Sequence, residues 1–353
     1  MSSPVVSVCI PTYNGEKYLR ETLNCVLAQT YKDFEVLVVD DHSSDNTYDI
    51  LLEYASKDKR IRIVRNEKNL GLVGNWNRCV ELAYGDWIKF VFQDDIIAPD
   101  CIERLLESCK GGSLFAVCRR NIIFDKDAEP LIKYYKEYIE NVTIEKIFHG
   151  ETVISPEMFK SACLEYMEGN FVGEPTAVML HKSIFKKVGL FNTHLIQMCD
   201  IEFWIRVGIY EGFVYVPDNL ATFRVHTDGT SFINRKKRIS RMYFLDSITL
   251  FHEFAFNPLY KPLRDAAFMN IPQINFKDLL IYKVHEFVTM IESRSRDDAS
   301  ENLDYFSEWK EITRNFPVLL ELPVKGYPRI IHAINRRLRV FYYKYFYNRS
   351  ILF

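Results

Sequence analysis

The sequence predicts an α/β fold, in which an open sheet of buried parallel strands is followed by an α-helical C-terminal extension. Apolar runs begin at Val5 and Val36, and each run ends abruptly at polar residues, which is typical of buried strands in a parallel sheet. A helical pattern follows each run, and the order strand, helix, strand, helix indicates an open α/β sheet. After about residue 233 the pattern changes to amphipathic helical segments.

Polar residues follow the first two predicted strands. Helical patterns are present at residues 16–29 and 46–55, one after each strand. Ligands of open α/β sheets bind beyond the carboxyl ends of the strands, so we expect Thr12 to Asn14, together with Asp40 and Asp41, at the mouth of one crevice. Carboxylates in that position suit hydrogen bonds from a base or a ribose, or a bound cation.

The third and fourth strands are predicted at residues 61–65 and 87–92, and the fourth leads directly into Asp94 and Asp95. Adjacent carboxylates at a strand end repel each other unless a cation or a helix terminus neutralises them, so the pair predicts a divalent metal ion. Capping of the helix that begins near Pro99 is the alternative use of these carboxylates. Four strands that end in one polar crevice favour the metal site.

The remaining segments define the predicted domains. We expect a catalytic domain at 1–232, with a donor-binding half at about 1–110 and an acceptor half at about 111–232, and a helical C-terminal region at 233–353. Residues 125–171 are expected to carry acceptor loops, because loops on a rigid scaffold commonly carry specificity. The expected elements are strands at 115–124, 177–180, 213–216 and 221–225, a helix at 200–209, and C-terminal helices at 239–256, 278–291 and 303–316.

The segment from Lys325 to the C-terminus is basic and aromatic and contains no acidic residue. Such a segment is typical of an element that contacts anionic lipid, so we expect peripheral membrane contact. Docking onto the catalytic domain, or onto a sister subunit in a homo-oligomer, is the alternative. Nucleic-acid binding is a competing use of a basic segment. The catalytic residues predicted earlier in the chain argue against this use.

The composition suits a globular protein with a large core. The chain has 353 residues, of which 48% are hydrophobic, and a formal net charge of −2. Its eight cysteines form no CxxC pair and are expected to be reduced thiols. The sequence contains no signal peptide and no apolar run long enough to cross a bilayer. We therefore expect a cytoplasmic protein associated with the inner face of the cell membrane.

Short motifs recur in a specific order through the first 230 residues or so. Two of them are Pro11-Thr12-Tyr13-Asn14-Gly15 and Gln93-Asp94-Asp95; the motifs lie at residues 6–19, 35–47, 69–71, 77, 85–87, 93–95, 173–175, 189–191, 199–206 and 223–226. Together they resemble the family 2 glycosyltransferases, which have the GT-A fold, a Rossmann-like nucleotide-diphospho-sugar transferase domain. Sugar-1-phosphate nucleotidyltransferases have a similar sheet, but they would need a Gly-rich phosphate loop after the first strand.

The resemblance implies a site for a nucleoside-diphosphate sugar. Thr12, Asn14 and Asp41 match positions that hold the base and the ribose, and Asn69 matches a position near a uracil-type base or the ribose. The implied nucleotide-sugar-binding residues are Pro11, Thr12, Tyr13, Asn14, Asp41, Asn69, Asn77, Gln93, Asp94 and Arg224.

The resemblance also implies a divalent cation, Mn²⁺ or Mg²⁺, held by Asp94, Asp95 and His226. Asp94 matches the last Asp of the family's Asp-x-Asp motif, and His226 lies in an Arg-x-His context that in some relatives reaches the metal or the diphosphate. Asp200 matches the general base that acts on the acceptor hydroxyl. The residues assigned to the acceptor side are Glu174, Glu202 and Trp204.

These residue types also suit the chemistry by themselves. A diphosphate leaving group develops negative charge, which a divalent cation and the donors of Arg224 and His226 can stabilise. The attacking hydroxyl must lose its proton, and Asp200 would accept it in a single displacement that inverts the anomeric centre.

Several residues have alternative interpretations. Glu202 competes with Asp200 for the base role, and either carboxylate could instead interact with the helix dipole. Trp204 lies at helical spacing among aliphatic residues, which favours a core position, and His226 could be an ordinary strand-end histidine. The family's first Asp of Asp-x-Asp is Phe92 here.

The expected function is metal-dependent, inverting transfer from a nucleoside-diphosphate sugar, with UDP expected as the nucleotide. The expected acceptor is a saccharide or a lipid-linked saccharide in bacterial surface-polysaccharide synthesis, an expectation that depends on the family analogy. A non-catalytic sugar-nucleotide-binding or scaffold protein on a decayed fold is the alternative, because of the substitution at Phe92.

Overall fold

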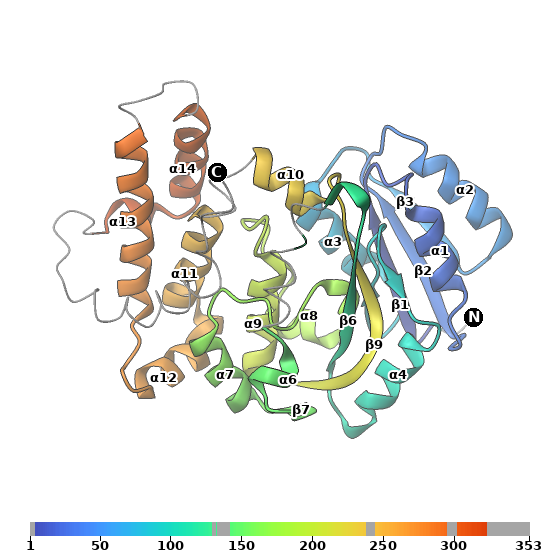
Figure 1. Cartoon of the computed structure of the whole chain (residues 1–353), viewed down its shortest axis with the longest axis horizontal. Helices are drawn as coiled ribbons and strands as arrows, with labels where there is room; N and C mark the ends of the chain where they lie inside the picture. The colour runs from blue at the N-terminus through green and yellow to red at the C-terminus, as the bar shows by residue number, and fades with distance from the viewer. Residues whose placement is uncertain (1–3, 129–131, 133–141, 238–243, 295–301, 323–353) are drawn as a thin grey trace.

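The structure is a computed structural model that describes residues 4–128, 132, 142–237, 244–294 and 302–322. Strands and their helices form one side of the molecule, and the helices of the C-terminal region form the other (Figure 1). The basic, aromatic segment that begins at Lys325 lies outside the described residues, so its expected membrane contact stays a prediction. Among the described residues, no helix is both long and apolar enough to cross a bilayer.

One mixed sheet forms the framework of the N-terminal part of the chain. The described strands pair in the order β3-β2-β1-β4-β8-β6-β9-β5, and β7 pairs with β9. β1, β2, β3 and β4 are mutually parallel, whereas β8 runs antiparallel to β4 and β6. The carboxyl ends of the parallel strands therefore share one edge. The strands are β1 Val6–Thr12, β2 Phe34–Asp40, β3 Ile61–Arg65, β4 Trp87–Phe90, β5 Ile96–Ile97, β6 Phe115–Phe124, β7 Val153–Ile154, β8 Val178–His181 and β9 Phe213–Val225.

The two strands expected at 213–216 and 221–225 are one strand in the structure. β9 continues through Pro217-Asp218-Asn219, which resembles a turn in the sequence. Its pairing with β6 shifts register on both sides of Arg119, and such an irregularity tolerates a proline, which has no N–H to donate to the ladder.

Helices cover both faces of the sheet because its central strands are apolar on both sides. Val8 and Ile10 pack in one core cluster and Cys9 packs in the other, as alternation along a strand requires. The helices of this part are α1 Leu19–Leu27, α2 Thr47–Lys57, α3 Gly71–Leu82, α4 Cys101–Ser108, α6 Ile144–Ile147, α7 Pro156–Glu165, α8 Ser183–Val188, α9 Cys199–Glu211 and α10 Thr230–Lys237.

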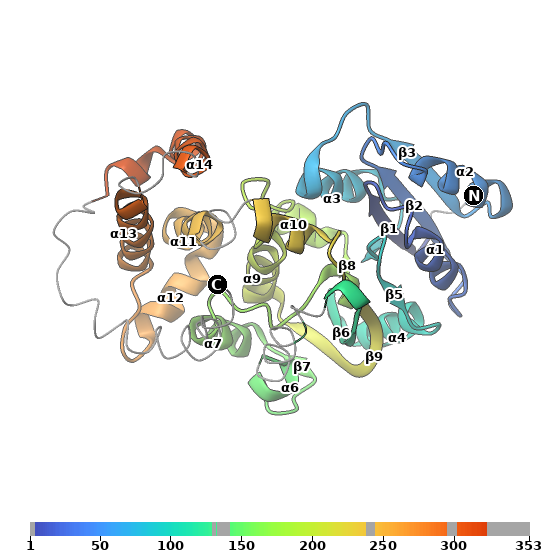
Figure 2. The ribbon, with the colours of Figure 1, turned by 45° about the horizontal axis from the view of Figure 1, so that its top comes forward.

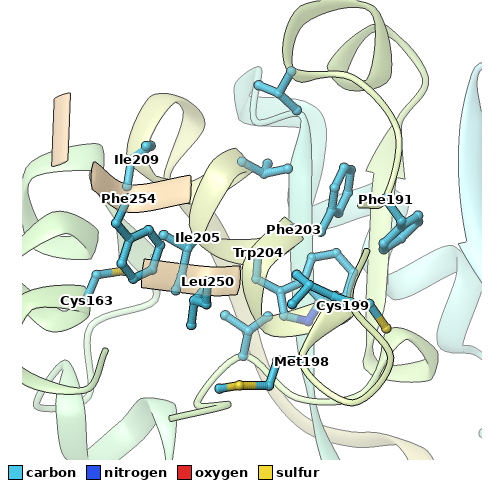
Figure 3. Packing of buried hydrophobic residues seen from close by; sticks show 14 of the residues in the cluster. Cys163, Phe191, Met198, Cys199, Phe203, Trp204, Ile205, Ile209, Leu250 and Phe254 are labelled. Atoms are coloured by element: carbon cyan, nitrogen blue, oxygen red, sulfur yellow. The ribbon is translucent and has the colours of Figure 1, made fainter. Parts of the chain in front are cut away.

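The C-terminal helices share a core with α9. α9 lies between the sheet and these helices in both views (Figures 1 and 2). Leu250 and Phe254 of α11 pack beside Ile205 and Ile209 of α9 (Figure 3). The last strand, β9, ends at Val225, the predicted boundary at residue 232 falls within α10, and the hydrophobic core continues from α9 into the C-terminal helices. The helices of this region are α11 Asp246–Phe256, α12 Lys261–Met269, α13 Phe276–Arg294 and α14 Asn302–Asn315.

Candidate active site

Asp41 joins the end of β2 to the start of α3. Its buried carboxylate accepts hydrogen bonds from Leu70 N (2.8 Å) and Gly71 N (3.0 Å) at the first turn of the helix, and from Asn66 Nδ2 (2.8 Å). A carboxylate offers about four acceptor positions, so about one remains for a ligand. Asn69 lies beside this turn, where its amide donates to Asp41 O (3.3 Å) and accepts from Gly71 N (2.9 Å).

A buried amide network that the sequence did not predict ties the ends of β1 and β2 together. Asn75 donates to Val39 O (3.0 Å) and Thr12 O (3.4 Å), and its Oδ1 accepts from Asn66 Nδ2 (3.1 Å). A sequence signal was available, since Asn75 lies one turn before the buried Cys79. An amide on an apolar helix face requires polar partners when it is buried.

Gln93 fixes the loop that follows β1. Its Oε1 accepts from Tyr13 N (2.9 Å) and its Nε2 donates to Tyr13 O (3.1 Å). A Cβ at Gly15 would lie 2.3 Å from Gln93 Oε1, so a larger residue there would displace the Gln93 amide from these bonds. Asn14 adopts φ 47° and accepts from Ser44 N (2.9 Å). Pro11 and Thr12 are buried, whereas Tyr13 and Asn14 are exposed and form the part of this loop that faces outward.

Asp94 and His226 meet although 132 residues separate them in the chain. Asp94 Oδ2 lies 2.9 Å from His226 Nε2, and the edge of the Tyr18 ring packs on the imidazole at 4.8 Å. Neighbouring ligands of an octahedral Mg²⁺ or Mn²⁺ ion lie about 3 Å apart, because each metal–oxygen distance is about 2.1 Å. The pair therefore fits two adjacent positions around such an ion.

Asp95 faces the interior instead of the crevice. Its fully buried carboxylate accepts from Thr176 Oγ1 (2.5 Å) and Arg224 N (3.0 Å), and burial and the charge of Asp94 raise its pKa. In this position Asp95 has a structural role, because its carboxylate does not join Asp94 and His226. Within the described ranges, no group of three or more His, Cys, Asp or Glu side chains could hold a metal ion.

Arg224 is held by protein oxygens on every side. Its Nε donates to Asp94 O (3.0 Å), its Nη2 donates to Glu21 (2.6 Å), and its Nη1 lies 3.6 Å from Asp125. The guanidinium packs over the Tyr18 ring at 4.7 Å. These contacts favour a role in holding the main chain of Asp94 over direct contact with a nucleotide.

Asp200 lies in the first turn of α9 and is half-buried. Its Oδ2 accepts from Asn170 Nδ2 (2.8 Å) and its Oδ1 accepts from Ile201 N (2.8 Å). Burial, and next the negative charge of Glu174, raise the pKa of Asp200 to about 7, which suits a general base near neutral pH. Glu174 forms an ion pair with Arg120 and also raises the pKa of Asp95, so its charge acts on both carboxylates.

Three of the expected site residues have interior positions. Glu202 is buried and forms a bidentate ion pair with Arg206 (2.9 and 2.8 Å). Trp204 is also buried, and its Nε1 donates to the main-chain oxygen of Gly173. Its helical spacing in the sequence favoured this core position. The amide of Asn77 is occupied by both main-chain groups of Phe191 (2.9 Å each). The geometry thus favours structural roles for all three, whereas Asp200, in the first turn of α9, keeps a partly exposed carboxylate.

Sequence comparison matches residues 7–188 to the family model described as glycosyl transferase family 2. The chain is 31% identical over 229 residues to an uncharacterized protein, MT1568, of Mycobacterium tuberculosis, covering 65% of this chain and 69% of that protein. It is 35% identical over 131 residues to the putative teichuronic acid biosynthesis glycosyltransferase TuaG of Bacillus subtilis, covering 37% and 52%.

Two solved structures share the arrangement of elements. The mannosyltransferase PcManGT from Pyrobaculum calidifontis, in complex with GDP-Man and Mn²⁺, superposes with a TM-score of 0.52 at 16% identity, covering 96% of this chain and 88% of that one. S. aureus TarS 1-349 in complex with UDP superposes with a TM-score of 0.50 at 18% identity, covering 92% of each chain. At these identities the likeness shows the fold alone.

Proposed function

Because the chain belongs to glycosyl transferase family 2 and has the GT-A fold, we propose that this glycosyltransferase uses a UDP-sugar, requires a divalent cation and inverts the anomeric centre. The family assignment makes the chain an enzyme, so the non-catalytic alternative lacks support. The catalytic machinery is proposed to lie within residues 1–232.

The meeting of Asp94 and His226 carries the proposal. The two side chains lie at the edge where the parallel strands end, which is where the loop after β1 and the carboxylate of Asp41 are also found. Asp94 and His226 would hold the cation, and two protein ligands leave most of its coordination sphere to diphosphate oxygens and water. The remaining acceptor position of Asp41 suits an N–H donor of a base such as uracil.

The proposed reaction assigns one role to each side. When bound, the cation would offset the negative charge that develops on the diphosphate leaving group. Asp200 would accept the proton of the acceptor hydroxyl while that oxygen attacks the anomeric carbon from the face opposite the diphosphate. Bond formation and departure in one step would invert the configuration.

The acceptor is proposed from the relatives and not from the site. TuaG is named for teichuronic acid biosynthesis, and by analogy we propose a saccharide or lipid-linked saccharide acceptor in a surface polysaccharide. The proposed association with the inner face of the membrane depends on the segment that begins at Lys325. Hydrolysis of the donor does not measure this association.

A donor-hydrolysis assay tests the proposal. UDP- and GDP-sugars are incubated with the enzyme in EDTA, Mg²⁺ or Mn²⁺, and released nucleoside diphosphate is measured. We expect metal-dependent release from a UDP-sugar, lost in Asp94→Ala and lowered about 10²-fold or more in Asp200→Asn, since a general base contributes about that much. Asp218→Ala is the matched control, because it removes an exposed carboxylate far from the proposed site. Asp218 lies on β9 six residues before Arg224, which is about 20 Å along the strand from that residue. Equal release in EDTA would refute the metal requirement.

A further inference from the structure

Among the residues that the structure describes, Asn170 is the only one whose side chain donates a hydrogen bond to the carboxylate of Asp200. It lies in the loop between α7 and the short helix Pro175–Ala177, thirty residues before Asp200. Its Nδ2 donates to Asp200 Oδ2 at 2.8 Å. A carboxylate that accepts such a bond is stabilised in its ionised form.

The direction of the Asn170 amide is determined by its second partner. Its Oδ1 accepts from Gly173 N at 2.8 Å, so the NH₂ group must face Asp200. Gly173 adopts φ +107°, which side chains rarely allow, and its carbonyl accepts from Trp204 Nε1 at 2.8 Å. Trp204 lies one turn after Asp200 on α9, so the loop is fixed to the helix that carries the base.

Burial and the negative charge of Glu174 oppose ionisation of Asp200. Glu174 faces it from the same loop and forms an ion pair with Arg120 of β6. The carboxylate of Asp246 at the start of α11 accepts hydrogen bonds from the main chain of residues 196–198, just before Asp200. Cys199 is a buried thiol on the same helix. Of the side chains named around Asp200, Asn170 is the one that donates a hydrogen bond to its carboxylate and so favours the ionised form.

We propose that Asn170 is a positioning residue, which aims the carboxylate of Asp200 and keeps it ionised near neutral pH so that it can accept the proton of the acceptor hydroxyl. This inference rests on the proposed role of Asp200 as the base. It assigns the loop at 170–173 to the acceptor half of the reaction, and Asn170 itself needs no contact with substrate.

The test is the pH dependence of UDP-sugar hydrolysis by the full-length enzyme. In Asn170→Ala we expect the acid limb of the kcat/KM profile to move upward by about one pH unit. The rate at pH 7 should fall several-fold and recover toward pH 9, while the Kd for UDP stays unchanged. Asn170→Ser, whose hydroxyl can donate to a carboxylate through water, should give a smaller shift. Asn192→Ala is the matched control, because Asn192 is a half-buried loop amide that accepts from His194 N and does not bond Asp200.

The outcomes separate the inference from the proposed function. A loss of rate by the same factor at every pH would show that Asn170 is only structural and overturn the inference. An unchanged profile in both Asn170 variants would also overturn it, and Asn170→Ser serves if the alanine variant does not fold. Full turnover in Asp200→Asn would refute the proposed base itself. An upward shift in Asn170→Ala together with inactive Asp200→Asn supports both.

Discussion

Replacing Asp200 by asparagine should inactivate the enzyme and stabilise its fold above neutral pH. The folded pKa of about 7 lies above the ordinary value of 3.8. The folded state therefore binds more protons than the unfolded state between these values, and the stability from Asp200 is present below pH 3.8 and lost as the pH rises through 7. Asparagine is close to the carboxyl in size and carries no charge, so it avoids the cost of ionisation, while the loss of an acceptor for one of the two donors offsets part of this gain.

The magnitude follows from the same two pKa values. A rise from 3.8 to about 7 corresponds to at most about 4 kcal/mol, at about 1.4 kcal/mol per pH unit. Asp200 is only half-buried, and solvent screening reduces this to about 1–2 kcal/mol. We expect Asp200→Asn to exceed the wild type by that amount at pH 8 and to match it near pH 4.

Urea denaturation at pH 4, 6 and 8, beside the hydrolysis assay, measures both effects. Asp246→Asn is a control with the opposite sign, because one carboxylate oxygen of Asp246, Oδ2, accepts all three main-chain N–H groups of residues 196–198 (2.5 to 3.1 Å), and a neutral amide oxygen accepts such bonds more weakly. A lower stability of Asp200→Asn at pH 8, or a gain that does not depend on pH, would refute the reasoning.

Three further predictions concern activity and packing. Hydrolysis should rise about tenfold from pH 6 to pH 8, because a base of pKa about 7 is about one-tenth ionised at pH 6; a flat profile would contradict this. Asp41→Ala should lower the free energy of unfolding by about 2–4 kcal/mol, since two main-chain N–H groups at the start of α3 and the side-chain amide of Asn66 lose their acceptor, and a loss below about 1 kcal/mol by urea titration would contradict it. Gly208→Ala should cost about 1–3 kcal/mol, because its Cβ would lie 2.4 Å from the Phe159 ring; thermal unfolding should show partial recovery when Phe159→Leu is added.

The framework of the sheet was predictable because parallel strands buried on both faces leave a strong sequence pattern. The apolar runs that end before Thr12 and Asp40 locate β1 and β2 within two residues. Pro217 misled the prediction at β9, since a proline in an apolar segment indicates a turn unless a register shift accommodates it. Helices α6, α7, α10 and α12 were missed, because the signals of these short segments are weak.

The directions of site side chains were less predictable than their identities. Asp94 and Asp95 are neighbours in the chain, but Asp94 lies in a turn that a hydrogen bond from Asp95 N to Phe92 O (3.1 Å) closes, so the two side chains point in different directions. One therefore meets His226 while the other faces Thr176. Glu202 follows Asp200 by two positions, about 200° around a helix, which directs it toward the interior. Which of two adjacent acids faces the crevice depends on tertiary packing, which a single sequence does not reveal.

The packing of α9 has a consequence for building chimaeras and shortened versions of this enzyme. The hydroxyl of Tyr260, which follows α11, donates to Glu202 at 2.5 Å, and Glu202 is the partner of Arg206. A chain cut at residue 232 would leave this carboxylate without one of its donors and expose the face that Leu250 and Phe254 cover. An exchange of C-terminal regions between relatives should therefore transfer α9 together with α11 to α14. The proposed base, Asp200, lies on α9 and would then come from the same relative as the C-terminal helices.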